Sequence, residues 1–139
     1  MLAANALNAT SLAVQTPRAR SSGLVLESNQ AQLGTAIQHE PGSTDISLGE
    51  SGTYELIYSA MATSADRAVP PVTASMQLTL NGRPIPGTLS ESTIPAPGHT
   101  VTLAGSAMVT VSGPAVVNLV PNNVDCTFSN ASVTVRKLD

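Results

Sequence analysis

Residues 47–61, which read SLGESGTYELIYSAM, decide how the rest of the chain is interpreted, and they contain both of its tyrosines. Gly49 and Gly52 predict a turn, and an extended run follows it. Successive side chains of a strand point to opposite sides. One side carries Tyr54, Leu56, Tyr58 and Ala60 and predicts a sandwich core. The other carries Glu55, Ile57, Ser59 and Met61, a half-apolar set that suits a subunit interface.

The composition also indicates hidden surface. The chain has 139 residues, enough for one domain with a proper core. Hydrophobic residues make up 42% and charged residues only 11% of it, whereas roughly 25% charged is usual for a soluble domain. We therefore expect either an oligomer that covers much of the surface or an unusually neutral exterior.

Charge and cysteine content exclude several classes of partner and crosslink. The net charge is −3, and the six basic residues form no patch beyond two close pairs, which disfavours nucleic acid. Cys126 is the only cysteine, so no intrachain disulfide can form. Its apolar neighbours predict a buried thiol, and an interchain bridge is the alternative.

The N-terminal residues do not resemble a signal peptide, because no basic segment precedes the apolar run and Asn5 and Asn8 interrupt it. No apolar run approaches transmembrane length, so we expect no membrane insertion. The chain would then either stay inside the cell that makes it or reach a surface by assembly.

Strand signals recur at short intervals between turn signals. Residues 1–20 predict an N-terminal arm or first strand, and residues 21–139 one sandwich domain. Besides the tyrosine strand, strands are predicted over 23–27, 35–39, 44–48, 72–80, 100–111, 115–120, 125–129 and 131–138. Asn81-Gly82 predicts a two-residue hairpin turn, because both residues tolerate positive φ. Further core positions are Met76, Leu78, Leu80, Val133 and Val135.

This spacing, with eight to ten strands and no convincing helix after residue 14, indicates an all-β antiparallel sandwich or barrel. Segments 63–71 and 83–98 are predicted to be loops, the second because it holds four prolines.

Four segments together resemble a known pattern: residues 52–58 (GTYELIY), 78–88 (LTLNGRPIPGT), 103–107 (LAGSA) and 131–138 (ASVTVRKL). They are similar to the C-terminal globular domain of bacterial and phage collagen-like proteins, of which the exosporium glycoproteins are examples. Those heads share the jelly roll of the tumour necrosis factor and complement-head superfamily. The resemblance covers about residues 23–139.

The resemblance implies a jelly roll of about ten strands that forms a tight homotrimer, with the tyrosine strand and the C-terminal strand in the inner sheet. Ile57 and Met61, together with Thr134 or Leu138, are then expected at or near the trimer interface. The resemblance also implies a place on a spore or cell surface or in a virion.

No pattern of catalytic or metal-binding residues stands out, and we expect neither an enzyme nor a cofactor. The run from Gly49 to Gly52 lacks the spacing of a nucleophile elbow. His39 and His99 are far apart in sequence and predict surface or loop histidines, too few for a zinc or cupin-type site. Three aspartates could contribute to a calcium site but lack a calcium-loop spacing: Asp45, Asp66 and Asp125.

Two functional hypotheses remain. The first is a structural and adhesive trimeric head that caps a surface filament or phage fibre and fixes its register. The second is a module that binds a host receptor or a glycan through the loops 63–71 and 83–98, since rigid sandwiches display function on loops. The candidate ligand residues of those loops are Asp66, Arg67, Arg83, Glu91 and His99.

Overall fold

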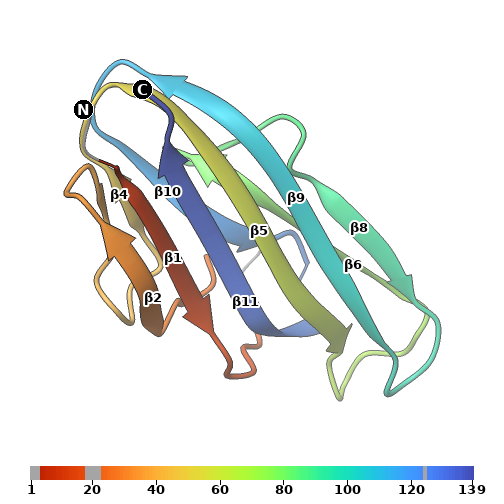
Figure 1. The fold of residues 1–139 in the computed structure, drawn as a ribbon. Coiled ribbons are helices and arrows are strands. Elements are labelled where there is room, and N and C mark those ends of the chain that lie inside the picture. The colour runs from red at the N-terminus through yellow and green to blue at the C-terminus, as the bar shows by residue number, and fades with distance from the viewer. Residues whose placement is uncertain (1–3, 18–22, 124) are drawn as a thin grey trace.

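The tyrosine strand, β5 (Gly52–Ser64), is the fourth of five strands in one of two packed antiparallel sheets (Figure 1). The computed structural model describes residues 4–17, 23–123 and 125–139. The five-stranded sheet, sheet A, has the order β2 (Ser28–Leu33), β1 (Ala6–Ser11), β11 (Cys126–Lys137), β5 and β9 (Thr100–Val111). The prediction of an all-β antiparallel sandwich is confirmed.

The second sheet, sheet B, lies behind sheet A in Figure 1 and completes the sandwich. Its strand order is β3 (Ile37–Gln38), β4 (Ile46–Leu48), β10 (Ala115–Pro121), β6 (Val72–Leu80) and β7 (Arg83–Pro84). The strand β8 (Ser90–Ile94) pairs with the first half of β6, on the same edge as β7.

The core forms between the sheets from the side chains that alternate inward. All three aromatic residues of the chain are fully buried in it: Tyr54, Tyr58 and Phe128. Of the other positions expected in the core, Leu56, Met76, Leu78, Val133 and Val135 are buried, and Leu80 is half-buried against the same cluster. In the described parts of the chain, no phenylalanine or tyrosine ring is therefore exposed for a ligand to stack on.

Three predicted segments differ in the structure. Residues 23–27 do not form a strand, although Leu24 and Leu26 are buried and donate backbone hydrogen bonds to Leu119 and Ser43. The two segments predicted over 125–138 are one strand, β11, because a bulge with φ of +53° at Asn130 absorbs the break in alternation. The expected loop 83–98 contains β7 and β8.

The predicted hairpin turn is confirmed, since Asn81 and Gly82 have φ values of +51° and +83°. The alternation of β9 also runs unbroken through Gly105. Gly105 continues the inward side of β9, and a Cβ there would lie 2.8 Å from Cε1 of Tyr58 and 2.9 Å from the carbonyl oxygen of Thr88. Only glycine leaves room for the Tyr58 ring at this point.

Tyr58 ties the two sheets together. Its hydroxyl donates a hydrogen bond to the backbone oxygen of Thr88 and also lies 3.2 Å from that of Met76. Burial raises the pKa of Tyr58 to about 12, and burial also raises the pKa of Tyr54, whose hydroxyl donates to the Glu50 carbonyl. Both phenols are therefore held neutral in the fold.

We expect the protein to lose stability between pH 10 and pH 12. The folded state keeps the Tyr58 proton up to a pKa of about 12, whereas an unfolded tyrosine releases it near 10. The stability that the raised Tyr58 pKa contributes is therefore fully present below pH 10. It is lost as the pH rises through the pKa of the folded state. Phenolate absorbance of a Tyr54→Phe variant isolates Tyr58. Titration near pH 10 with an intact circular dichroism spectrum would contradict the buried role.

Candidate functional site

The outer face of sheet A, the side turned away from the core, is almost free of charge. In register across β1, β11, β5 and β9, its central row is Asn8, Thr134, Ile57 and Ser106. The next row toward β9's start is Thr10, Ser132, Ser59 and Ala104. Small neutral side chains therefore surround Ile57, which is 46% exposed.

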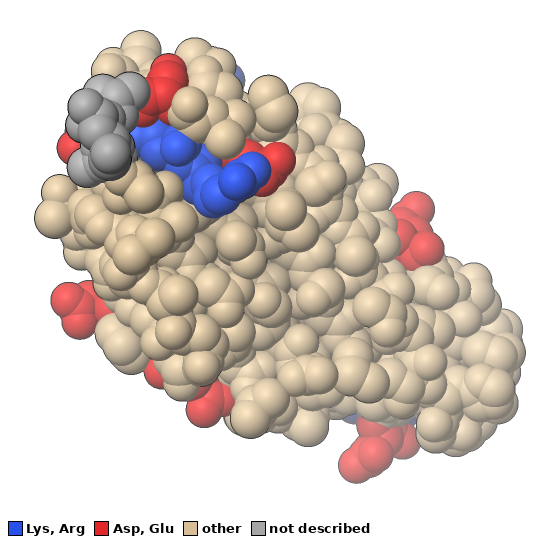
Figure 2. Space-filling model, viewed as in Figure 1, with Lys and Arg blue, Asp and Glu red and all other residues tan. Residues whose placement is uncertain are grey.

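Among residues 4–17, 23–123 and 125–139, one ion pair lies on this face. Arg136 and Glu55 are cross-strand neighbours, and the guanidinium Nη2 lies 2.6 Å from Oε1 of the carboxylate. Figure 2, which views the molecule from this side, shows one group of charges near the end that holds Lys137 and a broad uncharged surface over the rest of the sheet. Since the pair is neutral overall, the face carries almost no net charge.

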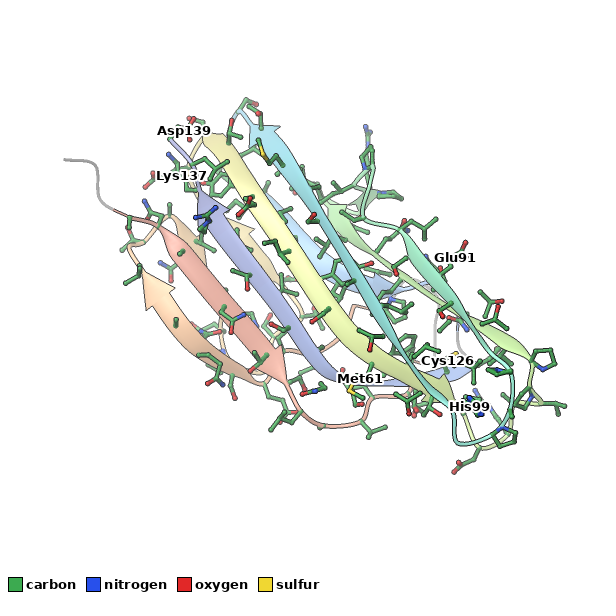
Figure 3. The ribbon with its side chains drawn as sticks, turned by 45° about the vertical axis from the view of Figure 1, so that its right-hand side comes forward. Met61, Glu91, His99, Cys126, Lys137 and Asp139 are labelled. Atoms are coloured by element: carbon green, nitrogen blue, oxygen red, sulfur yellow. The ribbon has the colours of Figure 1, made fainter. Side chains whose placement is uncertain are left out.

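The four predicted interface residues occupy different parts of this sheet. Ile57 is central, and Thr134 is its direct partner on β11. Thr134 is half-buried, and its hydroxyl accepts a hydrogen bond from Asn8 Nδ2 at 2.9 Å. Met61 is 36% exposed and lies near the end of β5, where Asn130 Nδ2 contacts its sulfur (Figure 3). Leu138 is exposed just beyond β11, at the opposite end.

Two further apolar residues on this face were missed by the sequence interpretation. Met108 on β9 is 64% exposed and lies opposite Glu55, and Leu33 on β2 is 56% exposed and lies opposite Ala6. The alternation of β9 was a sufficient signal for Met108, because its neighbours Ala107 and Val109 were assigned inward. Leu33 could not be found in the same way, because no strand was predicted over residues 28–33, and its pairing with β1 was therefore not expected.

The edge of sheet A at β9 is long and only partly covered, at the point where the Ala104 backbone amide donates to Ser90 Oγ of β8 at 3.3 Å. This strand spans 12 residues, pairs only with β5 in the described parts of the chain, and contains no charged residue or proline. Proteins usually shield such edges with charges, prolines or a covering element, because an open strand edge pairs readily with other chains. The uncharged face and the uncharged edge are continuous.

The five candidate ligand residues do not come together. Asp66 and Arg67 lie on the loop after β5, and His99 lies on the turn before β9, where Thr63 Oγ1 donates to its carbonyl oxygen at 2.8 Å. Glu91 lies midway along sheet B opposite Ser75 (Figure 3). Arg83 follows the hairpin turn at the other end, where the Asn81 amide donates to the Val116 carbonyl.

The end that carries Asp66, Arg67 and His99 is the end away from the chain termini, which lie side by side because the Lys137 amide donates to the Asn5 carbonyl. A hollow of about 440 Å³ lies there, and its lining includes Asp66, Arg67 and Val14. We call this region the distal end.

The two histidines and the cysteine singled out in the sequence differ in their exposure to solvent. His39 lies in the loop after β3, one of the two places expected for the histidines, but it is buried, and its ring nitrogens lie within hydrogen-bond distance of Asn29 Oδ1 and the Ser43 carbonyl oxygen. His99 is exposed, as predicted. The Cys126 thiol is buried, also as predicted, and burial raises its pKa. A buried thiol cannot reach another chain, so the interchain bridge is disfavoured.

The aspartates considered for calcium are not gathered into a cluster. Among residues 4–17, 23–123 and 125–139, no three histidine, cysteine, aspartate or glutamate side chains lie close enough to hold a metal ion. No helix in the same residues is long and apolar enough to cross a membrane.

Several solved structures match the whole of this sandwich. The globular domain of zebrafish complement 1qA superposes with a TM-score of 0.69 and 8% identity, covering 96% of this chain and 95% of that one. Murine APRIL gives a TM-score of 0.69 and 11% identity, covering 97% and 99%. Pika GITRL gives 0.54 and 11%, covering 99% and 98%.

The chain has the jelly-roll fold of complement globular heads and tumour necrosis factor-type ligands. No family model and no curated protein matches the sequence. The similarity to these structures therefore lies in the arrangement of the strands. The sequence identity is too low to assign roles to individual residues of this chain from them.

Proposed function

We propose that this chain is a non-enzymatic homotrimeric head that assembles through the outer face of sheet A. Its place would be at the end of a bacterial surface filament or phage fibre, outside the cell or in a virion, where three copies cap the fibre and fix its register. The observation that carries the proposal is the uncharged face around Ile57 together with the uncharged edge strand β9.

Burial of this face would supply the energy of assembly. Ile57, Met61 and Met108 are each at least 36% exposed in the single chain, and full burial of such a side chain contributes about 1.5–3 kcal/mol relative to full exposure. Threefold symmetry repeats every contact three times, so modest gains multiply. The Glu55–Arg136 pair brings no net charge into the interface, and small neighbours such as Ser106 and Ala104 permit close approach.

Methionine oxidation tests the location of the interface. Met108 is 64% exposed in the single chain and Met76 is fully buried. We expect peroxide to oxidise Met108 and Met61 several-fold more slowly in the native protein than in the denatured chain, as read by peptide mass spectrometry. Met76 is the internal control for an intact core. Oxidation of Met108 near the denatured rate while Met76 stays protected would contradict the proposed interface.

A second candidate function, recognition of a receptor or an acidic glycan, is favoured by the distal end. The hollow there brings Arg67 and Asp66 beside the exposed Val14, and it lies opposite the termini, where a fibre would attach. An arginine suits a carboxylate or sulfate on a ligand.

We expect an Arg67→Ala variant to lose binding to acidic glycans on an array while it keeps the native molar mass. The matched control is Arg83→Ala, which removes the same charge at the other end of the molecule. Equal loss of signal in both variants would show a general charge effect and would contradict recognition at the distal end.

A further inference from the structure

The outer face of sheet B contains a polar groove that neither proposed function uses. The groove has a volume of about 480 Å³, within the range of about 300–1,000 Å³ that small-ligand sites occupy. Its floor is buried, since Thr79 is 6% and Val120 is 8% exposed. Thr79 is paired with Asn118 and Val120 with Gln77 across β6 and β10, so adjacent strands hold both walls in register.

The amide side chains around the groove are fixed by hydrogen bonds. Asn118 Nδ2 donates to the Thr44 carbonyl oxygen and to Asp45 Oδ1, each at 2.7 Å. Asn122 Nδ2 donates to Ser75 Oγ at 3.0 Å, and its Oδ1 accepts from Gln77 Nε2 at 3.2 Å. These contacts fix the side chains before any ligand arrives, which lowers the entropy cost of binding.

The same hydrogen bonds determine which donors and acceptors remain available to a ligand in the groove. The amide hydrogens of Asn118 point at Thr44 and Asp45, so the oxygens left over are Asn118 Oδ1, Gln77 Oε1 and the second carboxylate oxygen of Asp45. The Thr79 hydroxyl on the floor can donate or accept. Gln77 Nε2 and Asn122 Nδ2 each donate the one hydrogen bond described above and keep a second amide hydrogen. The groove therefore suits a ligand whose groups both donate and accept hydrogen bonds.

The charge of the lining narrows the ligand further. None of the described lining residues is cationic, and Asp45 is the only charged one among them, so this lining does not favour a phosphate, sulfate or sialic acid group. The lining also holds no aromatic ring, but Pro84 and Val120 supply an apolar patch. Hydroxyl donors beside a small apolar surface are the chemistry of a neutral sugar.

We propose that this groove binds a neutral sugar residue of a glycan. The groove lies on sheet B, opposite the face that would be covered in the trimer (Figure 1), so assembly leaves it open. The proposal does not depend on the trimer or on the distal end. Each sheet face would then have its own role, one in assembly and one in recognition.

The test is saturation-transfer NMR of the purified protein with methyl glycosides of neutral hexoses and N-acetylhexosamines at roughly millimolar concentration, suited to weak single-sugar sites. We expect at least one of these sugars to bind. Thr79→Val keeps the shape of the floor and removes its hydroxyl, and Gln77→Ala removes one acceptor. Each should raise Kd about three- to tenfold, the effect of one neutral hydrogen bond.

The matched control is Thr73→Val, which makes the same change at an exposed position of the same strand and face and should leave Kd unchanged. Melting temperatures verify that all variants fold. The proposal is overturned if no neutral sugar binds, if Thr79→Val and Thr73→Val bind alike, or if a diamine binds where sugars do not. None of these outcomes would alter the molar mass or the binding of acidic glycans, so the other proposals are tested separately.

Discussion

Ile57→Asp is expected to convert the proposed trimer into single chains that remain folded. Ile57 lies at the centre of the uncharged face, and its side chain does not contribute to the core. A carboxylate buried there without a partner costs about 3–5 kcal/mol, and the trimer would bury three of them. Light scattering at low micromolar concentration should report the mass of one chain, while circular dichroism stays unchanged.

Val69→Asp is the control for this experiment. Val69 is 84% exposed on the loop between β5 and β6, away from the outer face of sheet A. The same change of an apolar side chain to a carboxylate should leave the mass at that of three chains. If both variants, or neither, dissociate, the interface has been placed on the wrong surface.

Gly105→Ala is expected to destabilise the fold strongly. The added methyl would lie 2.8 Å from the Tyr58 ring and 2.9 Å from the Thr88 carbonyl oxygen. These are the two groups that join the sheets through the Tyr58 hydroxyl. Forcing them apart should lower the free energy of unfolding by about 3 kcal/mol, at the upper end for overpacked cores. Urea denaturation measures the loss.

The matched control for this variant is Gly113→Ala. A methyl group at Gly113 would meet no atom within 4 Å, so this substitution should change stability by less than about 0.5 kcal/mol. Equal stability of the two alanine variants would mean that Tyr58 does not require the space at Gly105.

Much of the sandwich could be predicted because alternation and turn chemistry are local signals. Tyr54 and Tyr58 alternate with Glu55 and Ile57 in the sequence, and this alone assigned the two sides of β5. Asn81-Gly82 fixed the hairpin after β6 for the same reason. These features depend on a few adjacent residues, so no knowledge of the rest of the fold was needed.

What could not be predicted depends on contacts between distant residues. The ring nitrogens of the buried His39 lie within hydrogen-bond distance of Asn29 Oδ1 and the Ser43 carbonyl oxygen, and no pattern around residue 39 reveals these contacts. The groove on sheet B needs the pairing of Thr79 with Asn118, which are remote in sequence. Proline content concealed β8, whose five residues lie between prolines and pair only with β6.

The most direct test of this account is the mass of the unmodified protein by sedimentation equilibrium at low micromolar concentration. One chain has a mass of 14.1 kDa, and shielding of the Ile57 face by two further copies predicts a single species of three times that value. A species of 14.1 kDa at this concentration would leave Ile57, Met61 and Met108 in water and would contradict the account.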